Sequence, residues 1–169
     1  MSLQQHDNDW LVRHARRILQ ERASAGASMS QVHASLRSMR RDKLPAPTRL
    51  RALWALHVTD GLSDDSLTSL LSDRNESLRG WAVRLFCEDG DPPAEAALRM
   101  IEMASQDQSA RVRLSLACAL QRLRPDMRWP LAEALAAHGE DAKDANLPLM
   151  IWYGTEPLIA DDLQRYAKL

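Results

Sequence analysis

Hydrophobic positions recur three to four residues apart through almost the whole chain, which is the spacing of one face of an amphipathic α-helix. No stretch shows the sustained apolar–polar alternation, rich in β-branched residues, that a strand requires. Ala, Leu, Arg, Gln and Met dominate, and all five are favourable in helices. The pattern therefore predicts an all-α protein.

Proline, glycine and capping residues divide the chain into short helices. Predicted helices cover residues 29–41, 63–71, 94–104, 127–137 and 147–153, and residues 156–169 are expected to form the start of a further helix. Turns are expected at residues 23–28, 43–48, 60–63, 88–93, 124–126 and 139–145. Residues 111–123 are apolar nearly all round, which predicts a helix packed between neighbours on both sides.

An aliphatic residue followed by arginine recurs at the same place in four predicted helices. The four pairs are Val12-Arg13, Leu50-Arg51, Leu78-Arg79 and Val112-Arg113, and the intervals between successive arginines are irregular but of similar length. Six residues before the arginine stands an aspartate in three copies, Asp7, Asp73 and Asp107, whereas the second copy has Pro45. Internal similarity at such spacings is typical of stacked helix pairs.

Each element of this pattern has a physical role. Aspartate near a helix N-terminus accepts bonds from unpaired backbone N–H groups and suits the positive end of the helix dipole. The arginine, with its rigid five-donor fork, can reach carbonyls or the aspartate of the adjacent repeat. The pattern resembles the second helix of a HEAT repeat. We therefore expect one HEAT-like domain over residues 1–169, an α-α superhelix (HEAT/armadillo-like solenoid) of four to five helix pairs with an arginine–aspartate ladder along the stack.

Longer phrases are more specific than the repeat pattern. They are WLVRHARR at 10–17, RLRALWALH at 49–57, LRGWAVRL at 78–85, ALQRL at 119–123 and DAKDANLPLMIWYG at 141–154, followed by EPL at 156–158. Together they resemble the helical-repeat region of the large bacterial PVC-type haem-binding proteins, often called membrane-bound dehydrogenases. The resemblance implies an exported, membrane-associated parent protein with a sugar-dehydrogenase-like propeller and a cytochrome c module.

The haem module of that family needs a CxxCH motif, which supplies two thioethers and an axial histidine, and this chain has none. What the resemblance carries over is the middle, spacer-like region, so no cofactor is expected here. The opening Met1-Ser2-Leu3 looks like a remnant of expression cloning, so we expect a piece excised from a longer protein. The sequence does not name the substrate of such a parent or the location of this piece.

The charge and hydrophobicity of the chain limit the kinds of partner that we expect. Lys and Arg number 22 against 23 Asp and Glu, for a formal net charge of −1, which gives no electrostatic reason to expect nucleic acid or an anionic membrane surface. No run of 18 apolar residues is present, so no membrane insertion is expected. The first residues lack the basic and apolar regions of a signal peptide, so we do not expect them to act as one. The expected partners are protein domains, either flanking ones or another protein.

Other reactive residues favour structural roles. Cys87 and Cys118 lack metal-ligand spacing and are expected to be small buried residues, although the sequence leaves their redox state open. His14, His57 and His138 have no partner at helical spacing, which argues against a metal site. The turn holding Glu140, Asp141, Lys143, Asp144 and Asn146 is explained by helix capping rather than by a cation.

The tryptophans leave two alternatives open. Trp10, Trp54 and Trp81 could line a groove and stack on a ligand, but core packing is favoured. Trp152 and Tyr153 with Glu156 form the remaining candidate interaction surface, because aromatic side chains with polar tips are enriched in binding surfaces. For these residues too, packing within the molecule is the favoured alternative.

Two functions remain from different classes. The preferred one is a non-catalytic scaffold, a spacer or docking module within a dehydrogenase or c-type cytochrome protein. The alternative is a HEAT-like nucleic-acid enzyme of the DNA glycosylase type, with Asp73 or Asp107 as the acid. The near-neutral charge disfavours this enzyme, because phosphate contacts supply most non-specific affinity for DNA.

Overall fold

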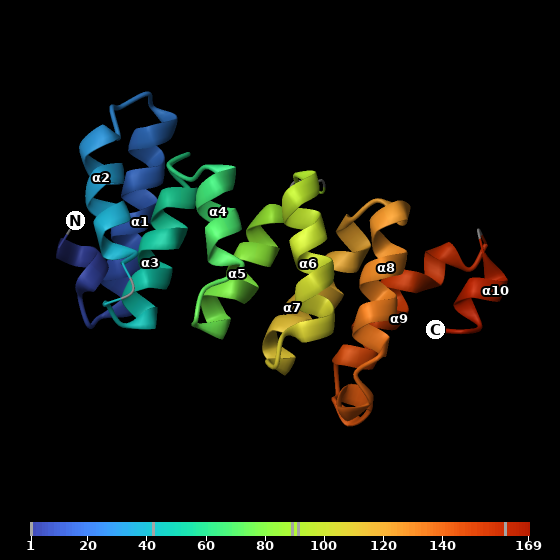
Figure 1. Ribbon diagram of the computed structural model, residues 1–169. Helices are drawn as coiled ribbons and strands as arrows, with labels where there is room; N and C mark the ends of the chain where they lie inside the picture. Colours follow the sequence, from blue (N-terminus) through green and yellow to red (C-terminus); the bar gives the residue numbers. More distant parts are fainter. Residues whose placement is uncertain (1, 42, 89, 91, 161) are drawn as a thin grey trace. The chain divides into compact units, whose positions relative to one another are not determined.

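The computed structural model describes residues 2–41, 43–88, 90, 92–160 and 162–169. Over these ranges the regular elements are all helices, without a β-strand (Figure 1). The prediction of an all-α protein is confirmed. The chain divides into two compact units, Met1–Ser66 and Leu67–Leu169, with the boundary inside helix α4 (Asp64–Leu70).

The described residues of the first unit form a short 3₁₀ helix, three complete α-helices and the start of α4. They are η1 (Ser2–Gln5), α1 (Asp9–Ser24), α2 (Ser30–Met39) and α3 (Ala46–His57). Helix α3 packs against both α1 and α2, and η1 lies against α1 and α3. A cluster of buried residues joins α2 to α3: Leu36, Met39, Ala52, Ala55 and Leu56. Where α4 begins, Ser63 Oγ accepts a bond from the backbone N–H of Ser66, as expected of a helix cap.

The second unit contains further α-helices, and from α7 onward short 3₁₀ helices lie between them. They are α5 (Glu76–Phe86), α6 (Ala94–Gln106), α7 (Ala110–Ala119), η2 (Leu120–Arg122), α8 (Pro125–Ala136), η3 (Gly139–Lys143), α9 (Leu147–Thr155), η4 (Glu156–Leu158) and α10 (Leu163–Tyr166). Helix α7 packs against α5 on one side and α9 on the other, and α6 packs against α8 (Figure 1). Helices two apart along the chain are therefore neighbours.

Helix α7 is packed on both sides, as its apolar sequence predicted. Val112, Leu116 and Ala117 are fully buried in it. Two glycines permit the close approach of its neighbours. A Cβ atom on Gly80 of α5 would lie 2.9 Å from Ser115 Oγ of α7, and one on Gly154 of α9 would overlap the Leu120 side chain.

Several sequence expectations need correction. Residues 156–169 do not form one helix, because Asp162 caps the separate short helix α10 by accepting a bond from Arg165 N–H. Helix α8 starts at Pro125, inside the expected turn, since proline suits the first position of a helix. Residue 161, and residues 89 and 91 of the expected turn 88–93, lie outside the described residues.

Candidate functional site

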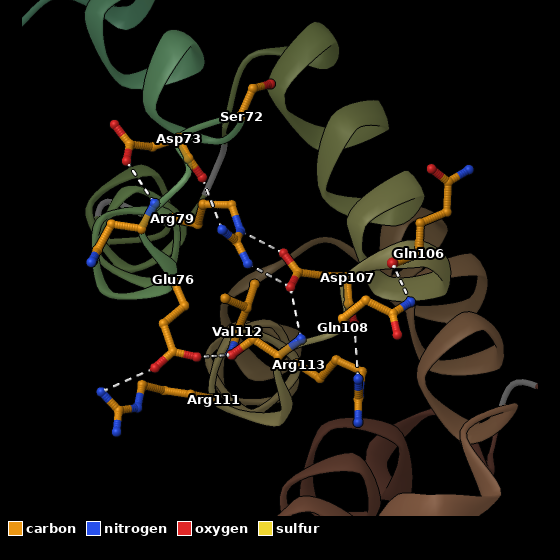
Figure 2. A network of polar contacts seen from close by, with 12 residues as sticks. Ser72, Asp73, Glu76, Arg79, Gln106, Asp107, Gln108, Arg111, Val112 and Arg113 are labelled. Carbon is orange, nitrogen blue, oxygen red and sulfur yellow. Dashed lines mark hydrogen bonds and ion pairs between the residues drawn. The ribbon is translucent and has the colours of Figure 1, made fainter. Parts of the chain in front are cut away.

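Arg79 on α5 makes the first complete step of an arginine–aspartate ladder (Figure 2). Its helix starts after Asn75, whose side chain accepts bonds from the backbone N–H groups of the first turn. Arg79 Nε and Nη2 donate to the two carboxylate oxygens of Asp107 at 2.6 and 2.7 Å. Arg79 Nη1 donates to the backbone carbonyl of Asp73 at 2.8 Å. One guanidinium thus holds the turn before its own helix and the turn before α7.

Arg113 on α7 repeats this arrangement. Its Nε and Nη2 donate to the carboxylate of Asp141 at 2.5 and 2.6 Å, and its Nη1 donates to the carbonyl of Asp107 at 2.8 Å. The Arg113 side chain is only 4% exposed and that of Asp141 only 10%. The two steps share Asp107, whose carboxylate faces Arg79 and whose carbonyl faces Arg113 (Figure 2). The result is a continuous polar chain from Asp73 to Asp141.

Asp141 belongs to the arginine–aspartate ladder, but the sequence pattern did not include it. We expected the carboxylates of this turn to cap a helix, and Asp144 does so, accepting bonds from the backbone N–H groups of Asn146 and Leu147. Asp141 binds Arg113 instead. The missed signal was its spacing, since the interval from Asp73 to Asp107 equals the interval from Asp107 to Asp141. The position corresponding to Arg79 and Arg113 is then Leu147, which cannot extend the ladder.

The electrostatics of the ladder favour permanent ion pairs. The side-chain hydrogen bonds to Asp107 raise the pKa of Arg79 above its ordinary value, and those to Asp141 do the same for the pKa of Arg113. Bidentate arginine–carboxylate pairs are among the stronger hydrogen-bonded contacts in proteins. Beside them, Glu76 of α5 accepts a 2.5 Å bond from Ser109 Oγ and lies 3.5 Å from Arg111 Nη1.

The first unit places its pattern residues differently. Arg51 donates to Asp9 Oδ1 at 2.6 Å and to the His6 carbonyl at 3.0 Å. Its carboxylate partner is therefore Asp9 rather than Asp7. Asp7 and Arg13 are exposed, and among the described residues neither takes part in the chain of contacts from Asp73 to Asp141. In the second unit Asp73 contributes its carbonyl to Arg79, while its carboxylate accepts a bond from Asn75 N–H.

The candidate surface of Trp152, Tyr153 and Glu156 divides in the structure. Trp152 and Tyr153 are 46% and 48% exposed, and Glu156 is exposed as well. Trp152 packs edge-on against Tyr166, with 5.9 Å between ring centroids, and borders a cavity of about 350 Å³. Tyr153 and Glu156 are not among the residues that line this cavity.

The cavity lies beside α9 and is mainly aliphatic and aromatic. Its lining comprises Leu135, Ala136, His138, Gly139, Asp141, Ala142, Leu147, Pro148, Ile151, Trp152, Thr155, Tyr166 and Leu169. Its polar members are already engaged: Asp141 binds Arg113, and Thr155 Oγ1 donates to the Ile151 carbonyl. His138 contacts the Ala104 carbonyl and Glu140 Oε1, both at 2.8 Å, and the latter contact lowers the pKa of Glu140.

The segment that closes the cavity is held by one arginine. Arg165 donates to both carboxylate oxygens of Glu133 on α8, at 2.6 and 2.9 Å. Its guanidinium also lies 5.0 Å from the ring centroid of Trp129, which is buried. Hydrogen bonding to Arg165 lowers the pKa of Glu133.

The predictions that Trp10 and Cys118 are buried in the core were wrong. Trp10 is 65% exposed and stacks on His14, because it lies on the open side of α1. Trp54 and Trp81 are half-buried, beneath the guanidinium groups of Arg16 and Arg84. Cys118 is exposed on α7 rather than buried, whereas Cys87 is buried and its pKa is raised to about 11 by desolvation.

Within the described ranges no group of three or more His, Cys, Asp or Glu side chains is placed to hold a metal ion. Nor does this part of the chain contain a helix long and apolar enough to cross a membrane. No family model matches the sequence, and comparisons with curated proteins and with solved structures gave no match.

Proposed function

We propose that the chain is a non-catalytic scaffold built as a HEAT-like stack of helix pairs, which serves as a spacer or docking module for protein domains. The observation that carries the proposal is the continuous chain of contacts from Asp73 through Arg79, Asp107 and Arg113 to Asp141. Bidentate pairs between successive turns hold α5, α7 and α9 in a regular register. A stack of helices joined by such pairs suits a spacer.

The same contacts weaken the enzyme alternative. A general acid or base must be able to exchange a proton with a substrate. Both carboxylate oxygens of Asp107 already accept bonds from Arg79, and one of them also accepts a bond from Ser109 N–H. Asp73, the other candidate acid, uses its carboxylate in the turn before α5. The carboxylates of Asp73 and Asp107 therefore accept hydrogen bonds that stabilise the fold.

The family resemblance gives this scaffold a setting. We propose that it belongs to the helical-repeat region of a PVC-type haem-binding, dehydrogenase-like protein, in which flanking modules carry the redox chemistry. The phrases at 10–17, 49–57, 78–85 and 141–154 support this assignment. Sequencing the complete gene tests it. A CxxCH motif in a flanking region is expected, and a complete gene without one contradicts the assignment.

A DNA assay tests the choice between scaffold and enzyme. The chain is mixed with a labelled duplex that contains an alkylated base, and binding is followed by fluorescence anisotropy at about 50 mM salt, where phosphate contacts are strongest. The scaffold predicts neither binding nor base release. Release that is lost in Asp107→Asn or Asp73→Asn but kept in Asp7→Asn would overturn the proposal. Asp7 is a suitable control because it has the same pattern position and is exposed.

A further inference from the structure

The cavity beside α9 lies where the regular stacking of helices in the second unit stops. Helix α7 packs on α5, and α9 packs on α7. Val83 of α5 and Ala117 of α7 are separated by the interval between successive ladder aspartates, and both are completely buried. Ile151 of α9 stands at the next such interval, but it is only half-buried and lines the cavity. The following helix, α10, has 4 residues against 9 in α9, so it is too short to cover that helix.

The cavity combines a buried inner wall with an exposed rim. The buried lining residues are Leu135, Asp141, Leu147 and Thr155. The exposed lining residues are Ala136, Gly139, Ala142, Pro148 and Trp152. Tyr166 and Leu169 of the C-terminal segment, both half-buried, enclose it further. A small molecule can therefore enter past the rim and bury most of its surface against the inner wall, as ligands do in pockets of this kind.

The charges around the cavity favour a neutral ligand. Both carboxylate oxygens of Asp141 accept bonds from Arg113, whose side chain is almost fully buried. The two ring nitrogens of His138 contact the Ala104 carbonyl and the Glu140 carboxylate. A charged ligand would lose its hydration here and would meet only groups that are already paired, which is unfavourable. The same groups offer few bonds to water, and a buried water needs about two to four polar partners.

The volume and the aromatic walls indicate the size and shape of the ligand. An apolar cavity of about 150 Å³ takes up one benzene molecule. The cavity beside α9 has about 350 Å³, which is a little more than twice that volume. Two of its walls are the rings of Trp152 and Tyr166, which meet edge-on at an interplanar angle of 71°. A further aromatic ring packs favourably on such walls, either stacked with an offset or edge-on.

We propose that the cavity beside α9 binds a small neutral aromatic molecule with two fused rings. The ligand buries its rings against Leu135, Leu147 and Ile151 and makes aromatic contacts with Trp152 and Tyr166. Its affinity comes from hydrophobic burial and ring packing rather than from an ion pair. This binding site goes beyond the scaffold function, because a spacer needs no small ligand, and neither proposal depends on the other.

The probe for this site is β-naphthol, which has two fused rings and is uncharged near neutral pH. It is titrated into the full, isotopically labelled chain, and binding is followed by backbone amide shifts in NMR spectra. Saturable shifts are expected in α9, in residues 135–142 and in residues 166–169. A dissociation constant of about 0.1 mM is expected for a ligand of this size in an apolar pocket.

Two related compounds test the class of ligand. β-Naphthoate has the same rings but carries a carboxylate, and phenol is neutral but has a single ring. Each should bind at least about tenfold more weakly than β-naphthol. The first must bury a charge without an unpaired partner, and the second leaves about half of the cavity unfilled.

Matched variants of the chain test the location. Ala142→Phe places a bulky side chain at the rim of the cavity, whereas Ala145→Phe makes the same change at an exposed residue outside the lining. Neither change removes a core residue. The first should weaken binding of β-naphthol at least about tenfold, and the second less than about twofold. Trp152→Ala removes an aromatic wall and should weaken binding about fivefold, whereas Leu149→Ala, at a similarly exposed residue of α9 outside the lining, should change it less than about twofold.

Three results would overturn the inference. They are the absence of a saturable shift at this cavity, binding of β-naphthoate or phenol as tight as that of β-naphthol, and equal binding by the Ala142→Phe and Ala145→Phe variants. The first shows that the cavity takes up no such ligand, the second contradicts the class of ligand, and the third places the probe elsewhere. None of them bears on the DNA assay, so failure of the ligand site and failure of the scaffold proposal remain distinguishable.

Discussion

Arg51 in the first unit and Arg113 in the second occupy the same place in the repeated sequence pattern but make different contacts. Arg113 binds both carboxylate oxygens of Asp141 and is almost fully buried. Arg51 binds one oxygen of Asp9, whose side chain is 62% exposed, and a backbone carbonyl. The partner of Arg113 lies later in the sequence, whereas that of Arg51 lies earlier.

This contrast follows from spacing. A guanidinium fork can make two parallel bonds only when the carboxylate lies at a fixed distance and angle. In the second unit equally spaced aspartates supply this geometry twice, at Asp107 and at Asp141. Around Arg51 the intervals to the preceding and following pattern arginines are unequal, and the geometry is not repeated. A short sequence motif therefore locates the arginine, and only a regular period determines its partner.

The largest expected effect is that of Asp141→Ala in the second unit. The substitution removes the bidentate partner of the buried Arg113 guanidinium and leaves it the exposed carboxylate of Glu140, whose Oε1 lies 3.5 Å from Arg113 Nη2. Removing one partner of a buried pair costs about 3–5 kcal/mol. Urea unfolding followed by circular dichroism measures the loss in the free energy of unfolding.

A double variant serves as the control for this effect. Replacing both partners, as Arg113→Met with Asp141→Leu, should recover most of the loss because no unpaired charge remains buried. A loss below about 1 kcal/mol in Asp141→Ala would show that the pair behaves like a surface contact. The contrast between the two units would then disappear.

Part of the arginine–aspartate ladder could be predicted from the sequence. Helical periodicity located the helices, and the aliphatic–arginine pairs identified Arg79 and Arg113. The pattern wrongly included Asp7 and Arg13, because six-residue spacing from a helix residue does not specify how a turn is oriented. The pattern does not include Asp141, because Leu147 rather than an arginine stands six residues after it. The cavity beside α9 could not be predicted, because it depends on how Tyr166 returns toward Trp152.

Close helix packing in the second unit predicts a smaller effect for Gly154→Ala. A Cβ atom there would overlap the Cβ atom of Leu120, so α9 must shift away from η2. Overpacking of this kind costs about 1–3 kcal/mol. In Gly139→Ala the added Cβ meets no atom within 4 Å, so a change within about 0.5 kcal/mol is expected. Equal unfolding free energies for the two variants would contradict the close approach.

Alkaline pH offers a test confined to the second unit, which holds both cysteines. Burial raises the pKa of Cys87 from 9.0 to about 11. A raised thiol pKa means that the folded state holds its proton more tightly, so the stabilisation is present below pH 9 and is lost as pH rises toward 11. Linkage predicts a decline of about 1.5 kcal/mol between about pH 9 and about pH 10.5.

Cys87→Ala isolates this contribution from other groups that titrate in the same range. Urea unfolding at several pH values should show the wild-type chain losing more stability than the variant. Parallel curves for the two proteins would indicate that the Cys87 thiol has an ordinary pKa in the folded state. Hydrogen exchange should locate the wild-type loss in residues 67–169, which would show that the two units respond independently.

The smallest effect is expected for Asp9→Ala in the first unit. Asp9 is mostly exposed, and exposed ion pairs contribute about 0–1 kcal/mol because water and salt screen them. Arg51 also retains its bond to the His6 carbonyl, so the substitution leaves no buried cation unpaired. Raising the salt concentration should remove most of the difference in unfolding free energy between wild type and variant, whereas the Asp141→Ala loss should persist because its pair is shielded from solvent. An Asp9→Ala loss well above the range of exposed ion pairs, about 2 kcal/mol or more, and insensitive to salt would mean that Arg51 depends on its carboxylate as strongly as Arg113 does.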